Sequence, residues 1–271
     1  MQKKQINKDG NRMKSFVKSF FQYQFLLQEL VKKGIKLKYR NSYLGIIWSL
    51  LEPLLTMIVL TIVFGTLLQK SDDKTFPIYI LCGRLLYTFY SDASKAALTS
   101  IRKNASMIKK VYVPKYIYTL SSILFNFVIF LISLIVLVLV SLVMGIRPTW
   151  YLLQAPFVLA ALLLLAVGTG YILATWGVFF RDLEHLWSVA LMLIMYTCAI
   201  FYNADKLLKS HWGFILKGNP LFCLIECFRD AVFGRMINMH YFLYAVGFSL
   251  VALVLGLWMF YKKQDEYILH I

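Results

Sequence analysis

The chain has 271 residues, of which 60% are hydrophobic and 15% charged, and its mean hydropathy is +0.67. Soluble domains carry about 25% charged residues, so the composition excludes an ordinary soluble protein and predicts an integral membrane protein. The formal net charge of +16 comes from basic residues that lie between long apolar runs, which favours a membrane surface over nucleic acid as their partner.

The segment before the first apolar run falls into two parts. Residues 1–12 are polar and basic, and we expect this N-terminus to be disordered. Residues 13–45 begin with apolar side chains at three- and four-residue steps, with charged side chains largely between them, and end as a basic linker. The pattern predicts an amphipathic helix that lies on the inner membrane surface.

The first membrane span is predicted at about residues 46–68, because this run supplies the roughly 20 apolar residues that a helix needs to cross a bilayer. Its start follows a group of cations, so we expect that end in the cytoplasm. Pro53 lacks an N–H to donate and predicts a kink. Glu52 should face the bundle interior or a wet cavity, since a charge in lipid is costly.

Five further spans complete a predicted membrane domain over residues 46–262. They are expected at about 76–98, 117–144, 151–180, 186–202 and 241–261. Asn219 followed by Pro220 is a strong helix start, yet the helix after it is too short and too charged to span. We predict an all-α fold with six transmembrane helices, short re-entrant outer helices before the last span, and a cytoplasmic tail at 263–271. Cytoplasmic termini place most Lys and Arg inside, which supports this orientation.

Two inner segments offer surfaces that a cytoplasmic partner could contact. Residues 100–116 carry five Lys or Arg residues and can form a short helix that ends before Pro114. The sequence RDLEH at 181–185 is predicted as a tight inner turn between two spans.

Motifs for catalysis are missing from the sequence. It contains no GxxxxGK[ST] phosphate loop, no HExxH and no GxSxG; its four histidines are scattered and its four cysteines lack zinc-site spacing. We therefore expect no catalytic residues, no metal site and no cofactor in this chain. The protein is predicted to move a substrate, and the energy for uphill transport should come from a partner.

A family resemblance rests on five stretches that stand in one order along about residues 30–262. They are LKYRNSYLGIIWSLLEPLLTMIVLTIVFG, FPIYILCGRLLYTFYSDA, NASMIKKVYVPKYIYTLSS, RDLEH and NPL. Together they resemble the membrane subunit of polysaccharide-exporting ABC transporters, the ABC-2 type permeases. This group includes the exporters of O-antigen, capsule, teichoic acid and rhamnose-polysaccharide.

The resemblance implies partners, a location and a cargo. It implies a homodimer in the bacterial cytoplasmic membrane, two separate ATPase subunits that bind ATP and Mg²⁺, and a polyprenyl-diphosphate-linked glycan as substrate. It also implies that residues 13–33 are the interfacial gate helix and that 100–116 are the main coupling helix. The candidate residues for ATPase coupling are Arg102, Lys109, Lys110, Arg181 and Asp182.

Aromatic and charged side chains are the candidates for substrate contact. By resemblance the sugar path is lined by aromatic rings, and the path candidates are Trp48, Tyr87, Tyr90 and Glu52. Helical geometry puts Tyr87 and Tyr90 on one side of their span and turns Phe89 toward the bundle. Each ring could equally be a lipid-facing anchor or part of the core. The candidates for lipid-diphosphate entry are Lys36, Lys38 and Arg40, which could equally be ordinary charges of the positive inner side.

Other functions remain open at this point. An ABC-2 exporter of a small hydrophobic molecule, such as a drug, haem or lipid, would have the same spans. A membrane-bound glycosyl or acyl transferase would need clustered acidic or histidine residues, which the sequence lacks. A flippase that works without an ATPase would show no dependence on a partner.

Overall fold

The computed structural model describes much of the chain, and it leaves the side chains of residues 66–68 undescribed. The described residues are 23–267 apart from 41, 69–74, 111–112, 147, 203, 205–207, 209–210 and 212. The predicted disorder of residues 1–12 and the first ten residues of the predicted amphipathic helix lie outside the described residues.

All regular elements among the described residues are helical, which confirms the predicted all-α class. In chain order they are α2 (Gln24–Tyr39), η1 (Gly45–Ile47), α3 (Trp48–Leu60), η2 (Thr61–Leu68), α4 (Phe76–Lys103), α5 (Ala105–Ile108), α6 (Tyr116–Val143), η3 (Trp150–Gln154), α7 (Ala155–Phe179), α8 (Leu183–Thr197), α10 (Gly213–Lys217), α11 (Pro220–Val232) and α12 (Met239–Lys263). The segments η1 and η3 are 3-10 turns, and η2 is a π-helix that continues α3.

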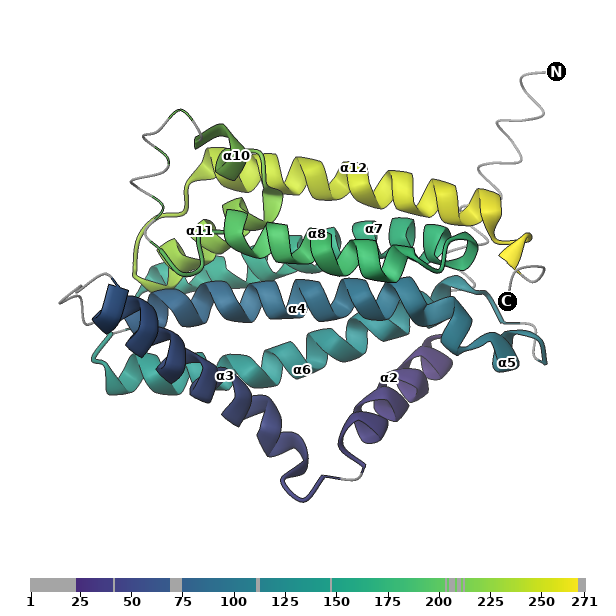
Figure 1. Cartoon of the computed structure of the whole chain (residues 1–271), viewed down its shortest axis with the longest axis horizontal. Coiled ribbons are helices and arrows are strands. Elements are labelled where there is room, and N and C mark those ends of the chain that lie inside the picture. Colours follow the sequence, from purple (N-terminus) through teal and green to yellow (C-terminus); the bar gives the residue numbers. More distant parts are fainter. Residues whose placement is uncertain are drawn as a thin grey trace.

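Five long helices, α4, α6, α7, α8 and α12, run side by side and form the body of the molecule (Figure 1). Helices α10 and α11 lie at one end of this bundle. The short helix α5 and the end of α12 lie at the other end. Helices α2 and α3 form a V on one side, where α2 packs on α6 and α3 contacts both α4 and α6.

Within the part of the chain that the structure describes, four helical segments are long and apolar enough to cross a membrane. They are Gly45–Gly65, Tyr116–Val143, Trp150–Phe179 and Met239–Lys263. Each lies within a few residues of a predicted span. The predicted span at 76–98 corresponds to α4, which is long enough but carries several charges, and the span at 186–202 corresponds to α8, which has only 15 residues.

Helix α4 is the centre of the bundle. It packs against α6, α7, α8 and α11, and most of its 28 residues are buried. Because protein rather than lipid surrounds most of α4, it can contain polar residues that a lipid-exposed helix would not tolerate.

The start of α11 confirms the sequence prediction. The side chain of Asn219 accepts a hydrogen bond from the backbone N–H of Leu221 at 3.0 Å, and Pro220 occupies the first helical position. This satisfies one of the free N–H groups that every helix start presents. The cap fixes where α11 begins and so places its charged residues beside α4.

Candidate functional site

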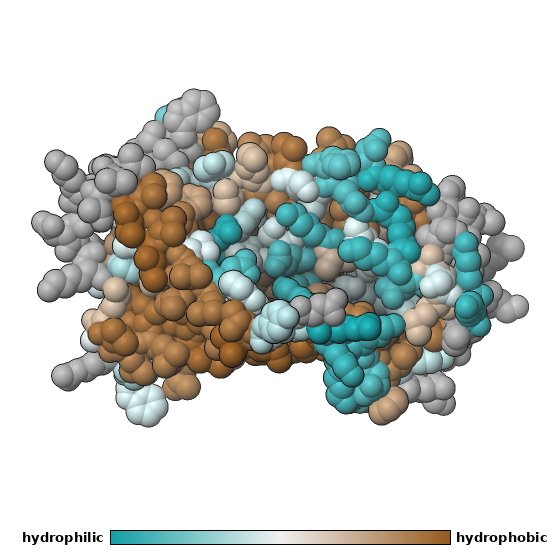
Figure 2. Space-filling model, turned by 60° about the horizontal axis from the view of Figure 1, so that its bottom comes forward, coloured by the Kyte–Doolittle hydropathy of each residue, from teal (hydrophilic) through white to brown (hydrophobic). Residues whose placement is uncertain are grey.

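A polar pocket lies between α2, α3, α4 and α6. Its volume is about 60 Å³, which is room for a few water molecules. The lining residues are Lys38, Tyr39, Ser49, Glu52, Pro53, Thr56, Arg84, Leu85, Thr88, Phe89, Asp92, Asn126, Ile129, Phe130 and Ser133. Figure 2 shows the face that carries α2 and α3, with hydrophilic residues in its middle and on its right and hydrophobic residues on its left.

Four charged side chains from three helices meet at this pocket. Lys38 comes from α2, Glu52 from α3, and Arg84 and Asp92 from α4. Among the ion pairs of the described residues, none joins two of these four. Charges at membrane depth need water or a partner, because transfer into lipid is costly. Glu52 lines this pocket beside three other charged side chains. That water fills the pocket stays a prediction.

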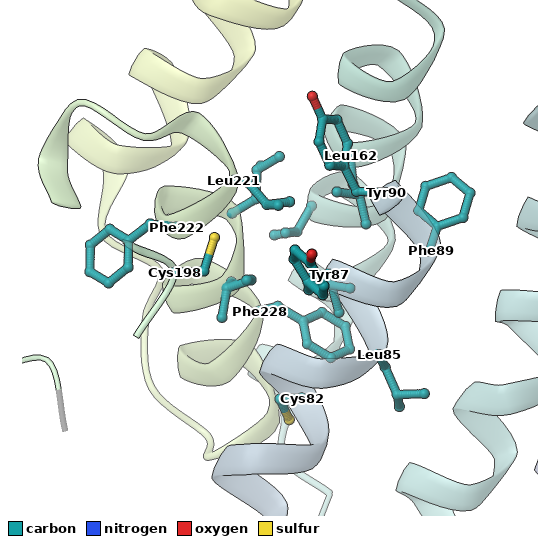
Figure 3. Packing of buried hydrophobic residues seen from close by; sticks show 14 of the residues in the cluster. Cys82, Leu85, Tyr87, Phe89, Tyr90, Leu162, Cys198, Leu221, Phe222 and Phe228 are labelled. Atoms are coloured by element: carbon teal, nitrogen blue, oxygen red, sulfur yellow. The ribbon is translucent and has the colours of Figure 1, made fainter. Parts of the chain in front are cut away.

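The ring of Phe89 lines the pocket, and those of Tyr87 and Tyr90 do not. Phe89 stacks on Phe130 with ring centroids 5.0 Å apart and meets Phe127 edge-on at 5.4 Å. Tyr87 and Tyr90 are 6% and 5% exposed and lie within the packed core. In Figure 3, Phe89 points to a different side of α4 from both tyrosines.

Phe89 itself is 3% exposed and belongs to the same apolar cluster, so it packs into the bundle, as the sequence analysis expected, while its ring also lines the pocket. The Tyr87 hydroxyl donates to the backbone oxygen of Leu191 in α8 at 2.8 Å. Whether Tyr87 and Tyr90 line a substrate path stays a prediction.

The remaining substrate candidates lie around the pocket without all reaching it. Lys36, Lys38 and Arg40 are all exposed at the end of α2, but only Lys38 lines the pocket. Trp48 opens α3 with 45% of its surface exposed and does not line the pocket. The structure thus brings Lys38 and Glu52 to one pocket, whereas Lys36, Arg40 and Trp48 are exposed elsewhere on the protein surface.

The predicted coupling residues gather at the end of the bundle opposite α11. Lys109 and Lys110 are exposed directly after α5, and Arg181 and Asp182 are exposed in the turn before α8. A hollow of about 440 Å³ lies at this turn. Its lining residues are Trp176, Phe179, Phe180, Arg181, Asp182, Leu183 and Leu186.

The guanidinium of Arg102, another coupling candidate, forms an ion pair within the chain. Its Nη2 atom donates to Glu184 Oε1, across the gap between the end of α4 and the start of α8. Only 21% of the Arg102 side chain is exposed. Arg102 thus joins the end of α4 to the start of α8, and its role in ATPase coupling stays a prediction.

The C-terminal segment also packs at this end. Tyr267 is fully buried, and its hydroxyl lies 3.0 Å from Thr175 Oγ1 of α7. Lys115 donates to the backbone oxygen of Gln264, and partial burial lowers the pKa of its ammonium group. The predicted cytoplasmic tail is thus anchored on the bundle at least as far as Tyr267.

Sequence reasoning missed the role of Arg229, which is 2% exposed in α11. Its Nη1 atom donates to Glu226 at 2.6 Å, its Nε and Nη2 atoms donate to the backbone oxygen of Tyr79, and Nη2 also donates to that of Ala199 at 3.1 Å. The guanidinium carbon lies 3.4 Å from the centroid of the Tyr79 ring. Arg229 therefore ties α11 to α4 and to the segment after α8. A charged residue in an apolar helix was the available signal.

Together these features define a class of protein: a multi-pass α-helical membrane protein with a charged pocket between its helices and basic segments at one end. Among the described residues, no group of three or more His, Cys, Asp or Glu side chains could hold a metal ion. The family pattern described as ABC-2 type transporter matches residues 25–233, and the chain belongs to that family.

Curated relatives agree with this assignment along nearly their whole length. The O-antigen export system permease protein RfbA of Klebsiella pneumoniae is 28% identical over 245 residues, covering 89% of this chain and 93% of that protein. RfbA of Myxococcus xanthus is 28% identical over 214 residues, covering 79% and 82%. The polysialic acid transport protein KpsM of Escherichia coli is 25% identical over 244 residues, covering 89% and 93%. The resemblance to polysaccharide-export permeases is confirmed.

Proposed function

We propose that this chain is the transmembrane permease of an ABC exporter that moves lipid-linked polysaccharide across the bacterial cytoplasmic membrane. The observation that carries the proposal is the similarity to the RfbA and KpsM permeases, which covers 79–89% of this chain. A similarity confined to one or two spans would not favour a polysaccharide over any other ABC-2 cargo.

The pocket supports a polar cargo. A glycan that crosses a bilayer needs water and weak polar contacts along its way, because strong fixed bonds would hold each sugar in place. Charged side chains, hydroxyl groups and Phe89 lie together at the pocket, which is the mixture that can contact a sugar on its polar edges and its C–H face. In one protomer the space holds only a few waters, so the path has to widen for transport.

The proposal includes six spans, formed by α3 with η2, α4, α6, α7, α8 and α12. Helices α10 and α11 form the re-entrant outer pair, and both termini are cytoplasmic. This topology is favoured by the bias of Lys and Arg toward the inner segments and by the position of α5 and α10–α11 at opposite ends of the bundle (Figure 1). A second copy of this chain completes the path, and the lipid diphosphate enters near Lys36, Lys38 and Arg40.

Energy comes from two separate subunits that bind ATP and Mg²⁺. The sequence of this chain lacks a phosphate loop, so the ATPase cannot reside in it as a P-loop domain. The exposed cations of Lys109, Lys110 and Arg181 gather at the end of the bundle where such a subunit would dock. This chain is accordingly a transport subunit without an enzymatic site of its own.

Reconstitution with the ATP-binding subunit tests the proposed function. Proteoliposomes are prepared with lipid-linked glycan in the outer leaflet and a glycosidase outside. Transporters whose ATPase side faces outward should carry the glycan into the lumen, so the fraction that the glycosidase can cleave should fall when ATP is added. Omission of ATP or of either protein should abolish the loss. Movement of a fluorescent phospholipid or a small drug, with the glycan left accessible, would contradict the proposal and favour export of small hydrophobic molecules.

A further inference from the structure

Helix α8 is attached to the rest of the protein in an unusual way. Of its 15 residues, only Leu191 is buried in the protomer. Large apolar side chains cover the rest of its surface and are exposed, namely Leu186, Val189, Met192, Leu193 and Tyr196. Apolar packing of α8 on the core is confined to Leu191 and to the partly buried Trp187, Ile194 and Met195.

Beside this limited apolar packing, a line of polar contacts joins α8 to α4, and we call it the α4–α8 seam. From the outer to the inner end it pairs Arg84 with Met195, Tyr87 with Leu191, Ser94 with Trp187, and Arg102 with Glu184. The Trp187 Nε1 atom donates to Ser94 Oγ at 2.9 Å, and the Tyr87 hydroxyl donates to the Leu191 oxygen at 2.8 Å. The pairs run antiparallel, so the seam follows both helices along most of their shared length.

Hydrogen bonds of this kind are effective between membrane helices. Lipid tails are as apolar as the side chains they replace, so interhelical polar contacts and close packing, rather than apolar burial, hold such helices together. Sliding or tilting α8 against α4 would break several of these bonds at once. The seam therefore makes the two helices behave as one rigid unit.

At the inner end of the seam lies the ion pair between Arg102 and Glu184, which we call the clasp. Arg102 lies in the last turn of α4 and Glu184 in the first turn of α8. Antiparallel helices bring a C-terminus and an N-terminus together, and the helix dipoles favour a cation at the first and an anion at the second. The ion pair thus joins two charges that their own helices already favour.

The clasp also lies beside the coupling segment. Helix α5 begins two residues after the end of α4, and Asn104 between them donates to the Ser100 oxygen at 2.8 Å. Ile108 of α5 and Ile101 of α4 are buried in the same apolar cluster. A displacement of α5 therefore acts directly on the end of α4 that carries Arg102.

We propose that α4 and α8 move as one unit that carries the displacement of α5 to α8, and that Arg102 and Glu184 are the positioning residues that clasp its inner end. This inference rests on the proposed function, since it assigns a mechanical route within an ATP-driven permease. Arg102 acts on α8 within the same chain, and the ATPase subunit does not bind its side chain.

A charge swap tests this role. In the complex with the ATP-binding subunit, Arg102→Glu and Glu184→Arg should each lower glycan exported per ATP hydrolysed by about threefold or more. The double variant Arg102→Glu/Glu184→Arg should regain most of the wild-type ratio, because the ion pair is restored in reverse. A merely structural defect would reduce the amount of folded transporter. The glycan exported per ATP hydrolysed does not depend on that amount, so it reports coupling alone.

Lys103→Glu is the matched control, since Lys103 is the exposed neighbour of Arg102 and undergoes the same charge change. Any defect of Lys103→Glu should not be rescued by Glu184→Arg. Wild-type ratios in both single variants, or a double variant as poor as the singles, would overturn the inference.

A second pair of variants examines the middle of the seam. Trp187→Phe and Ser94→Ala each remove the same hydrogen bond, so their combination should lower the coupling ratio no further than either alone. Fully additive losses would count against a shared contact. If the wild-type complex exports no glycan, the proposed function fails, whereas the seam can still be judged by whether the charge swap restores thermal stability in detergent.

Discussion

The guanidinium group of Arg229 has to find its hydrogen-bond acceptors inside the protein, because almost none of its surface is exposed. It finds them in one carboxylate and two backbone oxygens that come from different parts of the chain. One of these oxygens belongs to Ala199, whose φ of +46° is uncommon for a residue with a side chain. The fork of a guanidinium can reach all three acceptors, whereas the single nitrogen of a lysine cannot.

Replacing Arg229 with lysine should therefore destabilise the protein even though the charge is kept. We expect a loss of about 2 kcal/mol or more, since buried acceptors are left without donors. Thermal unfolding in detergent measures the effect. Arg235→Lys is the matched control, because Arg235 is exposed shortly after α11 and should tolerate the change. Equal stability of Arg229→Lys and wild type would show that the network does not hold α11 in place.

Glu52 allows a direct test of the hydrated pocket. In a background without Cys82, Cys198, Cys223 and Cys227, a cysteine at position 52 should react with a charged, membrane-impermeant thiol reagent, because thiolate formation and reagent access both need water. Ile58→Cys is the control: Ile58 is 43% exposed on α3 but does not line the pocket. Complete protection of position 52 in every nucleotide state would exclude a wet pocket there.

At the scale of elements, α5 is the clearest docking candidate that remains once Arg102 is assigned to the seam. Ile108 anchors this single helical turn in the apolar cluster at the α5 end of the bundle, and the exposed Lys109 and Lys110 follow it. The buried Ile108 fixes the position of the turn, and the two lysine side chains are exposed at the surface. Such an arrangement suits a contact that has to transmit a displacement.

The double variant Lys109→Ala/Lys110→Ala should recover several-fold less ATP-binding subunit in a pull-down, with unchanged insertion into the membrane. Exposed charges contribute up to about 1 kcal/mol each, and raised salt should weaken the wild-type complex in the same direction. Lys217→Ala/Arg235→Ala is the control, because both cations lie toward the opposite end of the bundle. Undiminished recovery of the subunit would remove α5 from the docking surface.

Across the whole molecule, the bundle depends on close approach of α7 and α12. A Cβ atom on Gly256 would lie 2.5 Å from the Gly168 oxygen, and one on Gly168 would lie 2.5 Å from the Leu253 nitrogen. Small residues at membrane interfaces permit this proximity. On another face of α7, Gly170 approaches Ile123 and Ala97.

Gly256→Ala should force α7 and α12 apart and destabilise the protein by about 1–3 kcal/mol, since the obstructing atoms are backbone and cannot rotate away. Gly247→Ala in the same helix is the control, because a Cβ there meets nothing within 4 Å. Thermal unfolding of the two purified variants in detergent compares their stabilities. A Gly256→Ala variant no less stable than Gly247→Ala would mean that the two helices can separate at little cost.

The sequence by itself determined the class of the protein, the approximate position of each long helix and the start of α11. These properties depend on local patterns: long apolar runs for the spans, and Asn219 with Pro220 for a helix start. The order of five sequence stretches also identified the family, which the match over residues 25–233 confirms. None of these inferences required knowledge of which helix lies next to which.

Only the tertiary structure decided which side of each helix faces a neighbour. Helical spacing separated Phe89 from Tyr87 and Tyr90, but apolar side chains suit lipid and protein alike, so hydropathy could not tell the two surroundings apart. Charges were equally ambiguous: Arg102 turned out to be paired with Glu184, 82 residues along the chain. A contact between distant segments depends on how the bundle closes, and local sequence carries little information about that.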